Sequence, residues 1–260
     1  MNRPKKVAIV TGSTQGLGEA IARQLIAEKM IGGLVVCGRS AERGRRLAEE
    51  LTAPGCRTVF VPADLSRVED CQAVVEAARE EFGRIDYLVN SAATSERGSI
   101  LDSTPELFDR IMSLNVRAPF FLMQATLRLM IEQGIRGSIV NIISVSSHGG
   151  QPFLTPYSAS KGALVTLTKN VASSVAKERI RVNGLNLGWM DTPGEHAIQK
   201  RFHHAADDWL EKAERAQPMG RLVKPQEVAQ TVAFLLSERS GLMTGAIIDF
   251  DQHVVGASAT

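Results

Sequence analysis

Short apolar runs alternate with longer helical patterns along nearly the whole chain, and this alternation limits the possible folds more than any other feature. Short apolar runs are typical of buried strands, whereas apolar positions that recur every three or four residues indicate amphipathic helices. Strands separated by helices favour βαβ units and a parallel sheet whose two faces are both covered. The expected strands are Val7–Val10, Leu34–Cys37, Thr58–Val61, Ile85–Val89, Ser138–Ile143, Ile180–Leu187 and Ala246–Phe250.

Helical patterns fill the intervals between these runs, so we expect an α/β fold, a doubly wound Rossmann-type domain. It would hold a mainly parallel seven-stranded sheet with helices on both faces. The chain has 260 residues and no Gly/Ser-rich or Pro-rich linker, which favours a single domain over residues 1–260; two small domains are the alternative. Residues 188–222 interrupt the alternation and are expected to form a substrate loop or lid. The expected helices are Leu17–Met30, Ala41–Leu51, Val68–Phe82, Pro105–Met112, Val116–Gln133, Tyr157–Lys177 and Pro225–Leu236.

Composition narrows the classes of function. The 30 basic and 28 acidic residues leave a formal charge of +2, which weakens the case for nucleic-acid or membrane-surface binding. Cys37, Cys56 and Cys71 lie far apart without a CxxC pair, so we expect no disulfide framework, no zinc or other metal site, and a cytoplasmic location. No apolar run is long enough to predict a transmembrane helix.

A glycine-rich turn follows the first expected strand and opens the first expected helix. Glycines at such a turn let backbone amides approach a pyrophosphate, and the helix N-terminus adds partial positive charge. A turn that needs only flexible backbone is the alternative, but the strand before it and the helix after it match a dinucleotide site. The residues expected to bind the cofactor here are Gly12, Ser13, Thr14, Gln15, Gly16, Leu17 and Gly18.

The end of the second expected strand carries Gly38, Arg39 and Ser40 where a carboxylate would normally hold the ribose of NAD. Arg39 can pair with a 2′-phosphate through its planar set of donors, so we predict that NADP(H) is preferred over NAD(H). A solvated surface arginine is the alternative.

Tyr157 and Lys161 are four residues apart on an expected helix and would share one face. A nearby ammonium lowers the pKa of a phenol, which then exchanges a proton with a carbonyl or alcohol oxygen more readily. An exposed helical pair with no chemical role is the alternative.

The TGxxxGxG turn and Tyr157-Ser158-Ala159-Ser160-Lys161, in this context, resemble the short-chain dehydrogenase/reductase family from Lys6 to about Asp251. The resemblance implies that Tyr157 is the general acid/base and that Lys161 lowers its pKa and holds the nicotinamide ribose. It also implies that Ser144 orients the substrate oxygen and that Asn115 holds a helix kink and a water. Asp64 would contact the adenine, with Leu65 beside it. The remaining cofactor residues would be Asn90 and Ala92, in the segment matching NNAG, and Gly188 and Thr192, near the nicotinamide.

Some of these positions have simpler interpretations. Ser144 could cap a strand end, Asn115 could satisfy buried backbone groups, and Asp64 could cap its own loop. Two positions depart from the family pattern: the segment Asn90–Ala93 reads NSAA, and Leu187 replaces the proline that the family has before Gly188.

We therefore expect an oxidoreductase that moves a hydride between nicotinamide and a carbonyl or secondary alcohol of a sugar, polyol or ketone. A catalytically idle nucleotide-binding regulator of the same fold is the alternative. The resemblance also implies a homodimer or homotetramer built on the helices expected at 116–133 and 157–177. The residues expected to face the substrate are Ser144, His148, Phe153, Tyr157 and Trp189, with a contribution from residues 94–97.

Overall fold

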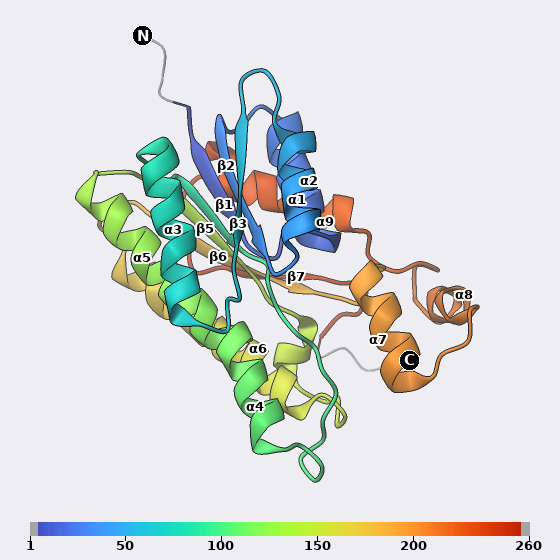
Figure 1. Ribbon diagram of the computed structural model, residues 1–260. Coiled ribbons are helices and arrows are strands. Elements are labelled where there is room, and N and C mark those ends of the chain that lie inside the picture. The colour runs from blue at the N-terminus through green and yellow to red at the C-terminus, as the bar shows by residue number, and fades with distance from the viewer. Residues whose placement is uncertain (1–4, 256–260) are drawn as a thin grey trace.

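The computed structural model describes residues 5–255, and one twisted parallel sheet runs through its centre (Figure 1). The strands follow the order β3-β2-β1-β4-β5-β6-β7, and every neighbouring pair is parallel. This confirms the expected α/β fold with a seven-stranded sheet. The strands are β1 Val7–Val10, β2 Gly33–Gly38, β3 Arg57–Pro62, β4 Tyr87–Asn90, β5 Ser138–Ile142, β6 Arg181–Leu187 and β7 Ile247–Phe250.

Helices cover both faces of the sheet because successive strand residues point to opposite sides. Val10 packs into a core with helices α1, α2 and α9, whereas Ile9 packs into a second core with α3, α5 and α6. Each core is dominated by Val, Leu and Ile, which are the residues of the unbroken apolar runs in the sequence. The helices are α1 Gly16–Ala27, α2 Ala41–Leu51, α3 Val68–Phe82, α4 Pro105–Met112, α5 Ala118–Glu132, α6 Thr155–Ser174 and α9 Pro225–Leu236.

The strand order places a crevice where a ligand can reach the sheet. β1 pairs with β2 on one side and β4 on the other, so the chain connections leave β1 and β4 in opposite directions. Loops at the carboxyl ends of strands diverge at such a point, which is where open α/β sheets bind ligands. The loops that follow β1 and β4 contain the expected glycine turn and the NSAA segment.

The segment 188–222 projects from the body as two helices, α7 Pro193–His203 and α8 Trp209–Arg215 (Figure 1). A small apolar cluster around Trp209 and Leu222 holds this segment together. Its base is closed by a parallel bridge between Met190 and Val223, and the Asp191 amide donates to the Val223 carbonyl at 3.0 Å. The segment 188–222 lies outside the sheet, as expected, and it contains two helices rather than a loop alone.

One local feature differs from the expected pattern. The expected helix 116–133 begins within a π-turn, Ser113–Arg117, which joins α4 to α5.

Over residues 5–255 no helix has the length and apolar character needed to cross a membrane, and no group of three or more His, Cys, Asp or Glu side chains is arranged to hold a metal ion.

Candidate active site

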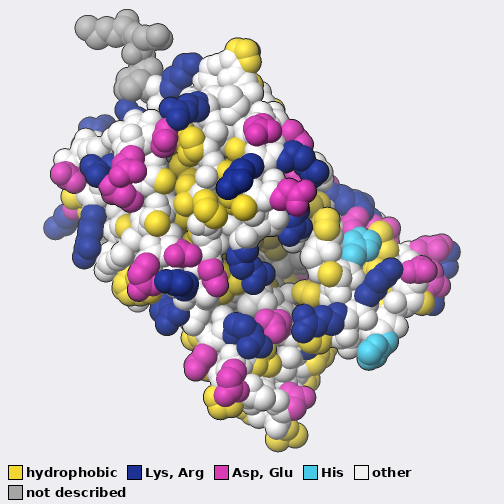
Figure 2. Space-filling model, in the orientation of Figure 1, with side chains coloured by type: hydrophobic (Ala, Val, Ile, Leu, Met, Phe, Trp, Pro, Cys, Tyr) yellow, Lys and Arg dark blue, Asp and Glu magenta, His cyan; other side chains and the backbone are white. Residues whose placement is uncertain are grey.

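A cavity of about 950 Å³ opens at the carboxyl edge of the sheet. In Figure 2 it is the hollow between the main body and the projecting segment, with Lys and Arg side chains at its rim. The volume lies near the top of the range for small-molecule and cofactor sites. Loops after β1, β2, β4, β5 and β6 contribute to its walls, so segments distant in sequence meet here.

The glycine turn is shaped by close backbone packing. Gly12 and Gly16 have φ values of +62° and +60°, a region that side chains disfavour. A Cβ on Gly12 would lie 2.8 Å from Ala92 Cα, and one on Gly18 would lie 2.5 Å from the Gly12 carbonyl oxygen. No side chain caps α1 at Gln15, so the free N–H groups of its first turn are available to an anion. This cradle fits a pyrophosphate.

Two residues expected near the cofactor have buried structural side chains. Ser13 Oγ donates to the Val10 carbonyl at 2.8 Å and accepts from the Cys37 amide at 3.0 Å. Asn90 Nδ2 donates to Asn141 Oδ1 at 2.8 Å. Neither side chain lines the cavity, because each joins neighbouring strands below it. A backbone contact of either residue with the cofactor stays a prediction.

Two arginines occupy the end of the cavity next to β2. A Cβ on Gly38 would lie 2.9 Å from Thr14 Cγ2, so a larger side chain at this position would have to displace that of Thr14. Arg39 lies beside it, and Arg43 Nη1, one helical turn further on, donates to Gln15 Oε1 at 2.7 Å. No carboxylate of the described residues forms an ion pair with either guanidinium. Sequence analysis missed Arg43, which lies in the first turn of α2, the helix that begins directly after Arg39 and Ser40.

Asp64 and Leu65 line the same end of the cavity. Asp64 Oδ1 accepts hydrogen bonds from the Ser66 hydroxyl at 2.8 Å and the Ser66 amide at 3.1 Å, and these bonds lower the pKa of the carboxyl group. Asp64 is therefore both the cap of its own loop and a wall of the cavity. Ser40, at the start of α2, accepts a hydrogen bond from the Arg43 amide at 3.4 Å and also lines the cavity.

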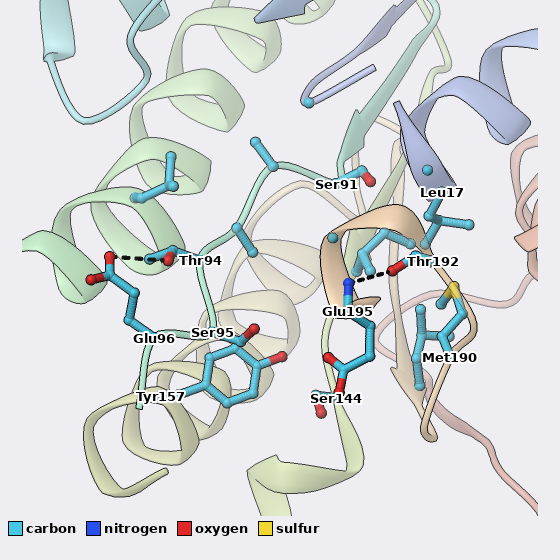
Figure 3. A pocket seen from close by; sticks show the side chains of 18 of the residues that line it. Leu17, Ser91, Thr94, Ser95, Glu96, Ser144, Tyr157, Met190, Thr192 and Glu195 are labelled. Atoms are coloured by element: carbon cyan, nitrogen blue, oxygen red, sulfur yellow. Dashed lines mark hydrogen bonds between the residues drawn. The ribbon is translucent and has the colours of Figure 1, made fainter. Parts of the chain in front are cut away.

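Tyr157, Ser144 and Lys161 meet in the middle of the cavity wall. Tyr157 and Lys161 come from the first turns of α6, and Ser144 follows β5 and caps a short 3₁₀ helix, Val145–His148. Figure 3 shows the Tyr157 and Ser144 side chains on the same side of the cavity. Lys161 is 2% exposed; its Nζ donates to the Ile142 carbonyl at 2.9 Å and lies 5.6 Å from the Tyr157 ring centroid.

Burial and nearby charges set the proton affinities of this group. Burial raises the pKa of Tyr157, the hydrogen bond with Ser144 lowers it, Glu195 raises it and Arg97 lowers it. Burial also lowers the pKa of Lys161 to about 8. The Lys161 ammonium is directed at the Ile142 carbonyl, and its effect on the pKa of the phenol stays a prediction.

Asn115 is buried in the π-turn between α4 and α5. Its Oδ1 accepts from the Thr94 amide at 2.9 Å, and its Nδ2 donates to the Thr94 carbonyl at 2.9 Å and to Ser160 Oγ at 3.0 Å. The side chain thus ties the loop after β4 to α6, the helix that carries Tyr157. It does not line the cavity, so the structure gives it a positioning role; the water relay implied by the resemblance stays a prediction.

Gly188 and Thr192 lie where the chain leaves β6 for the projecting segment. A Cβ on Gly188 would lie 2.0 Å from Asp251 Oδ1, so any side chain here would displace that of Asp251. Thr192 Oγ1 accepts from the Glu195 amide at 3.1 Å and caps α7, and its Cβ faces the glycine turn across the cavity (Figure 3). Both residues line the cavity, as does Ala92.

The expected substrate residues divide into two groups. Phe153 and Trp189 line the cavity beside Tyr157. His148 does not, because its Nε2 lies 3.2 Å from both Asp249 Oδ1 of β7 and Asn186 Nδ2 of β6. This placement does not support substrate contact by His148.

Comparison with known proteins agrees with this geometry. A family model described as enoyl-(acyl carrier protein) reductase matches residues 12–252. The short-chain dehydrogenase/reductase FrzI of Cladobotryum sp. is 33% identical over 251 residues, which cover 96% of each chain. The chain belongs to the short-chain dehydrogenase/reductase family.

Solved structures of known proteins share the fold of this chain. A variant of actinorhodin polyketide ketoreductase with NADPH has a TM-score of 0.88 and 31% identity, covering 95% of this chain and 96% of that one. A NAD⁺-bound xylitol dehydrogenase has a TM-score of 0.87 and 26% identity, covering 97% and 100%. This short-chain dehydrogenase/reductase is thus an oxidoreductase with a nicotinamide-binding fold.

Proposed function

We propose that this protein is an NADP(H)-dependent oxidoreductase that interconverts a carbonyl group and a secondary alcohol. One observation carries the proposal: the glycine cradle, two unpaired arginines and the Tyr157–Ser144 pair line one continuous cavity. The cradle suits a pyrophosphate, the arginines suit a further phosphate, and the hydroxyl pair suits a substrate oxygen.

When bound, the nicotinamide would give a hydride to a carbonyl carbon or take one from an alcohol carbon. Ser144 would hydrogen-bond the substrate oxygen and fix its position. In reduction, Tyr157 would donate its proton to that oxygen as the carbon–oxygen double bond becomes single; in oxidation it would accept the alcohol proton. Lys161, deep in the wall, would hold the ribose beside the tyrosine.

The preference for NADP(H) rests on Arg39 and Arg43. Their guanidinium groups lie at the end of the cavity next to β2 and form no salt bridge with a described carboxylate, although the charge of Arg39 reaches Asp64. A phosphate there would pair with them directly. The two solved neighbours bind different nicotinamide cofactors, NADPH in one and NAD⁺ in the other. The choice in this chain therefore follows from its own residues.

The substrate is proposed to be a sugar, polyol or ketone. The similar proteins named above include a ketoreductase and a xylitol dehydrogenase, whose names describe carbonyl reduction and alcohol oxidation. Phe153 and Trp189 supply apolar walls next to Tyr157, and the Arg97 and Glu195 side chains supply polar ones.

We further propose a homodimer or homotetramer in a reducing cytoplasm. Phe120 and Ile131 of α5 are 44% and 48% exposed, as is typical of surfaces that a partner covers. The three cysteines are free and buried, which suits a reducing compartment. Light scattering of the purified protein would show a monomer if the assembly is wrong.

An idle nucleotide-binding regulator is the competing function. The two are separated by measuring cofactor binding and turnover of a panel of sugars, polyols and ketones, with wild type and Tyr157→Phe. We expect both proteins to bind NADPH and only the wild type to turn over a substrate, followed by nicotinamide absorbance. Equal rates would remove Tyr157 from the mechanism, and cofactor binding without any turnover would favour the regulator.

A further inference from the structure

Two oppositely charged side chains face each other across the substrate end of the cavity. Arg97 comes from the loop between β4 and α4, and Glu195 comes from the first turn of α7. Arg97 Nη2 and Glu195 Oε1 are 3.8 Å apart, and the side chains are only 14% and 15% exposed. The distance gives charge compensation but is too long for a hydrogen bond.

Arg97 is held in place by neutral groups rather than by the carboxylate. Its Nε donates to His203 Nε2 at 3.0 Å, its Nη1 donates to the Ser95 carbonyl at 2.9 Å, and the guanidinium lies 5.6 Å from the centroid of the Phe153 ring. Within residues 5–255, Nη2 donates to no acceptor. One edge of a fixed guanidinium is therefore free to donate into the cavity.

Glu195 is held in the same way. Its Oε1 accepts from Trp189 Nε1 at 2.9 Å and from Gln199 Nε2 at 2.7 Å, and among the described residues Oε2 has no donor. The order Thr192-x-x-Glu195 is typical of a capping box, in which the glutamate turns back to the helix start. Here its carboxylate is instead directed toward Tyr157 (Figure 3). Each of the two side chains thus keeps one atom without a partner, Oε2 of Glu195 as an acceptor and Nη2 of Arg97 as a donor.

Two further side chains beside this pair add no net charge. Glu96 pairs with Arg110 at 3.1 Å. His203 accepts the Arg97 hydrogen bond on Nε2, and burial lowers its pKa, so the ring is neutral at neutral pH. The charges around Arg97 and Glu195 are therefore balanced, while the Lys161 ammonium, deeper in the wall, bonds to the neutral Ile142 carbonyl.

We propose that Arg97 and Glu195 determine specificity, binding one hydroxyl of a neutral polyhydroxylated substrate and rejecting carboxylates. A hydroxyl can accept from Arg97 and donate to Glu195 at once, which completes both side chains. A carboxylate can only accept, and it would lie against the Glu195 carboxylate. The inference rests on the proposed function, because it names the substrate class of that same site.

The test compares matched neutral and acidic substrates with the proposed cofactor. D-Glucose is paired with D-glucuronate and xylitol with D-xylonate, and acetophenone serves as an apolar ketone. We expect wild type to favour the neutral member of at least one pair about tenfold or more in kcat/KM, and Glu195→Gln to reduce that ratio about tenfold. Arg97→Gln should raise KM for the neutral member about tenfold, with a smaller change in kcat.

Glu211→Gln is the matched control, since Glu211 pairs with Arg215 on α8 and does not line the cavity. It should keep the wild-type ratio. A Glu195→Gln ratio equal to that of the control overturns the inference, and so does a wild-type preference for the acid or for acetophenone.

Binding separates this inference from the proposed function. If wild type turns over none of the compounds, the proposed oxidoreductase activity fails for this panel, and calorimetric binding to Tyr157→Phe with NADP⁺ then decides the inference. Tighter binding of the neutral member, lost when Glu195→Gln is added, supports it. Equal binding of both members, or binding of neither, overturns it.

Discussion

Replacing Lys161 with methionine is expected to stabilise the protein in the absence of cofactor, although the side chain is proposed to be needed for the reaction. The buried ammonium is 2% exposed and its pKa falls from 10.5 to about 8. A difference of that size corresponds to a cost of about 3 kcal/mol for keeping the charge buried at pH 7. Loss of the bond to the Ile142 carbonyl costs about 1–2 kcal/mol. The expected net gain is therefore about 1–2 kcal/mol.

The effect of Lys161 on the free energy of unfolding changes over a defined range of pH. A lysine whose pKa is depressed by folding destabilises the fold fully below about pH 8, and the penalty disappears as pH rises toward 10.5, because the unfolded chain then binds more protons than the folded one. The free-energy advantage of Lys161→Met over wild type should thus shrink by about 2 kcal/mol between pH 7 and pH 9.5.

Urea unfolding followed by circular dichroism at both pH values would measure this advantage. Lys169→Met is the matched control, since it makes the same change at an exposed position of α6. A Lys161→Met protein that is less stable than wild type at pH 7, with a difference that does not move with pH, would refute the reasoning about the buried charge.

Three further changes test other parts of the site. Arg39→Ser should lower kcat/KM with NADPH about 10–100-fold and leave NADH nearly unchanged, since only the former loses a charged hydrogen bond; an unaltered preference in steady-state kinetics would contradict the assignment. Gly18→Ala should cost about 1–3 kcal/mol in thermal or urea unfolding and weaken cofactor binding, because its Cβ would lie 2.5 Å from the Gly12 carbonyl oxygen. Ser144→Ala should reduce kcat about 10²-fold. It should also move the Tyr157-dependent limb of the pH–rate profile to higher pH, because the serine lowers the pKa of that phenol; a limb that stays in place would argue against contact between them.

The strands were predictable because their apolar runs report burial directly. The same holds for the two sequence signals that meet in the cavity, since the strand order of a parallel sheet brings the ends of β1 and β5 to one edge. The glycine turn and Ser144 share one cavity for this reason, although they are far apart in sequence.

Side chains whose partners are remote in sequence were harder to interpret. His148 precedes Tyr157 closely, yet it turns to Asp249, which lies 101 residues away. Ser13 and Asn90 sit in motif positions but bond to neighbouring strands. The helix α7 had a usable signal in Thr192-Pro193, a capping residue followed by proline, which predicts a helix start. No sequence signal predicts the direction of the Glu195 side chain, because that direction depends on hydrogen bonds with Trp189 and Gln199.

The bridge between Met190 and Val223 has a consequence for how such a protein can diversify. Because both ends of the excursion are fastened to each other, the intervening stretch can be lengthened, shortened or exchanged for another at a small entropic cost. The sheet edge and glycine turn beneath this stretch would keep their structure after such an exchange. New selectivity can thus be acquired by exchanging the part of the insert that follows Thr192, while the residues proposed for hydride transfer stay as they are.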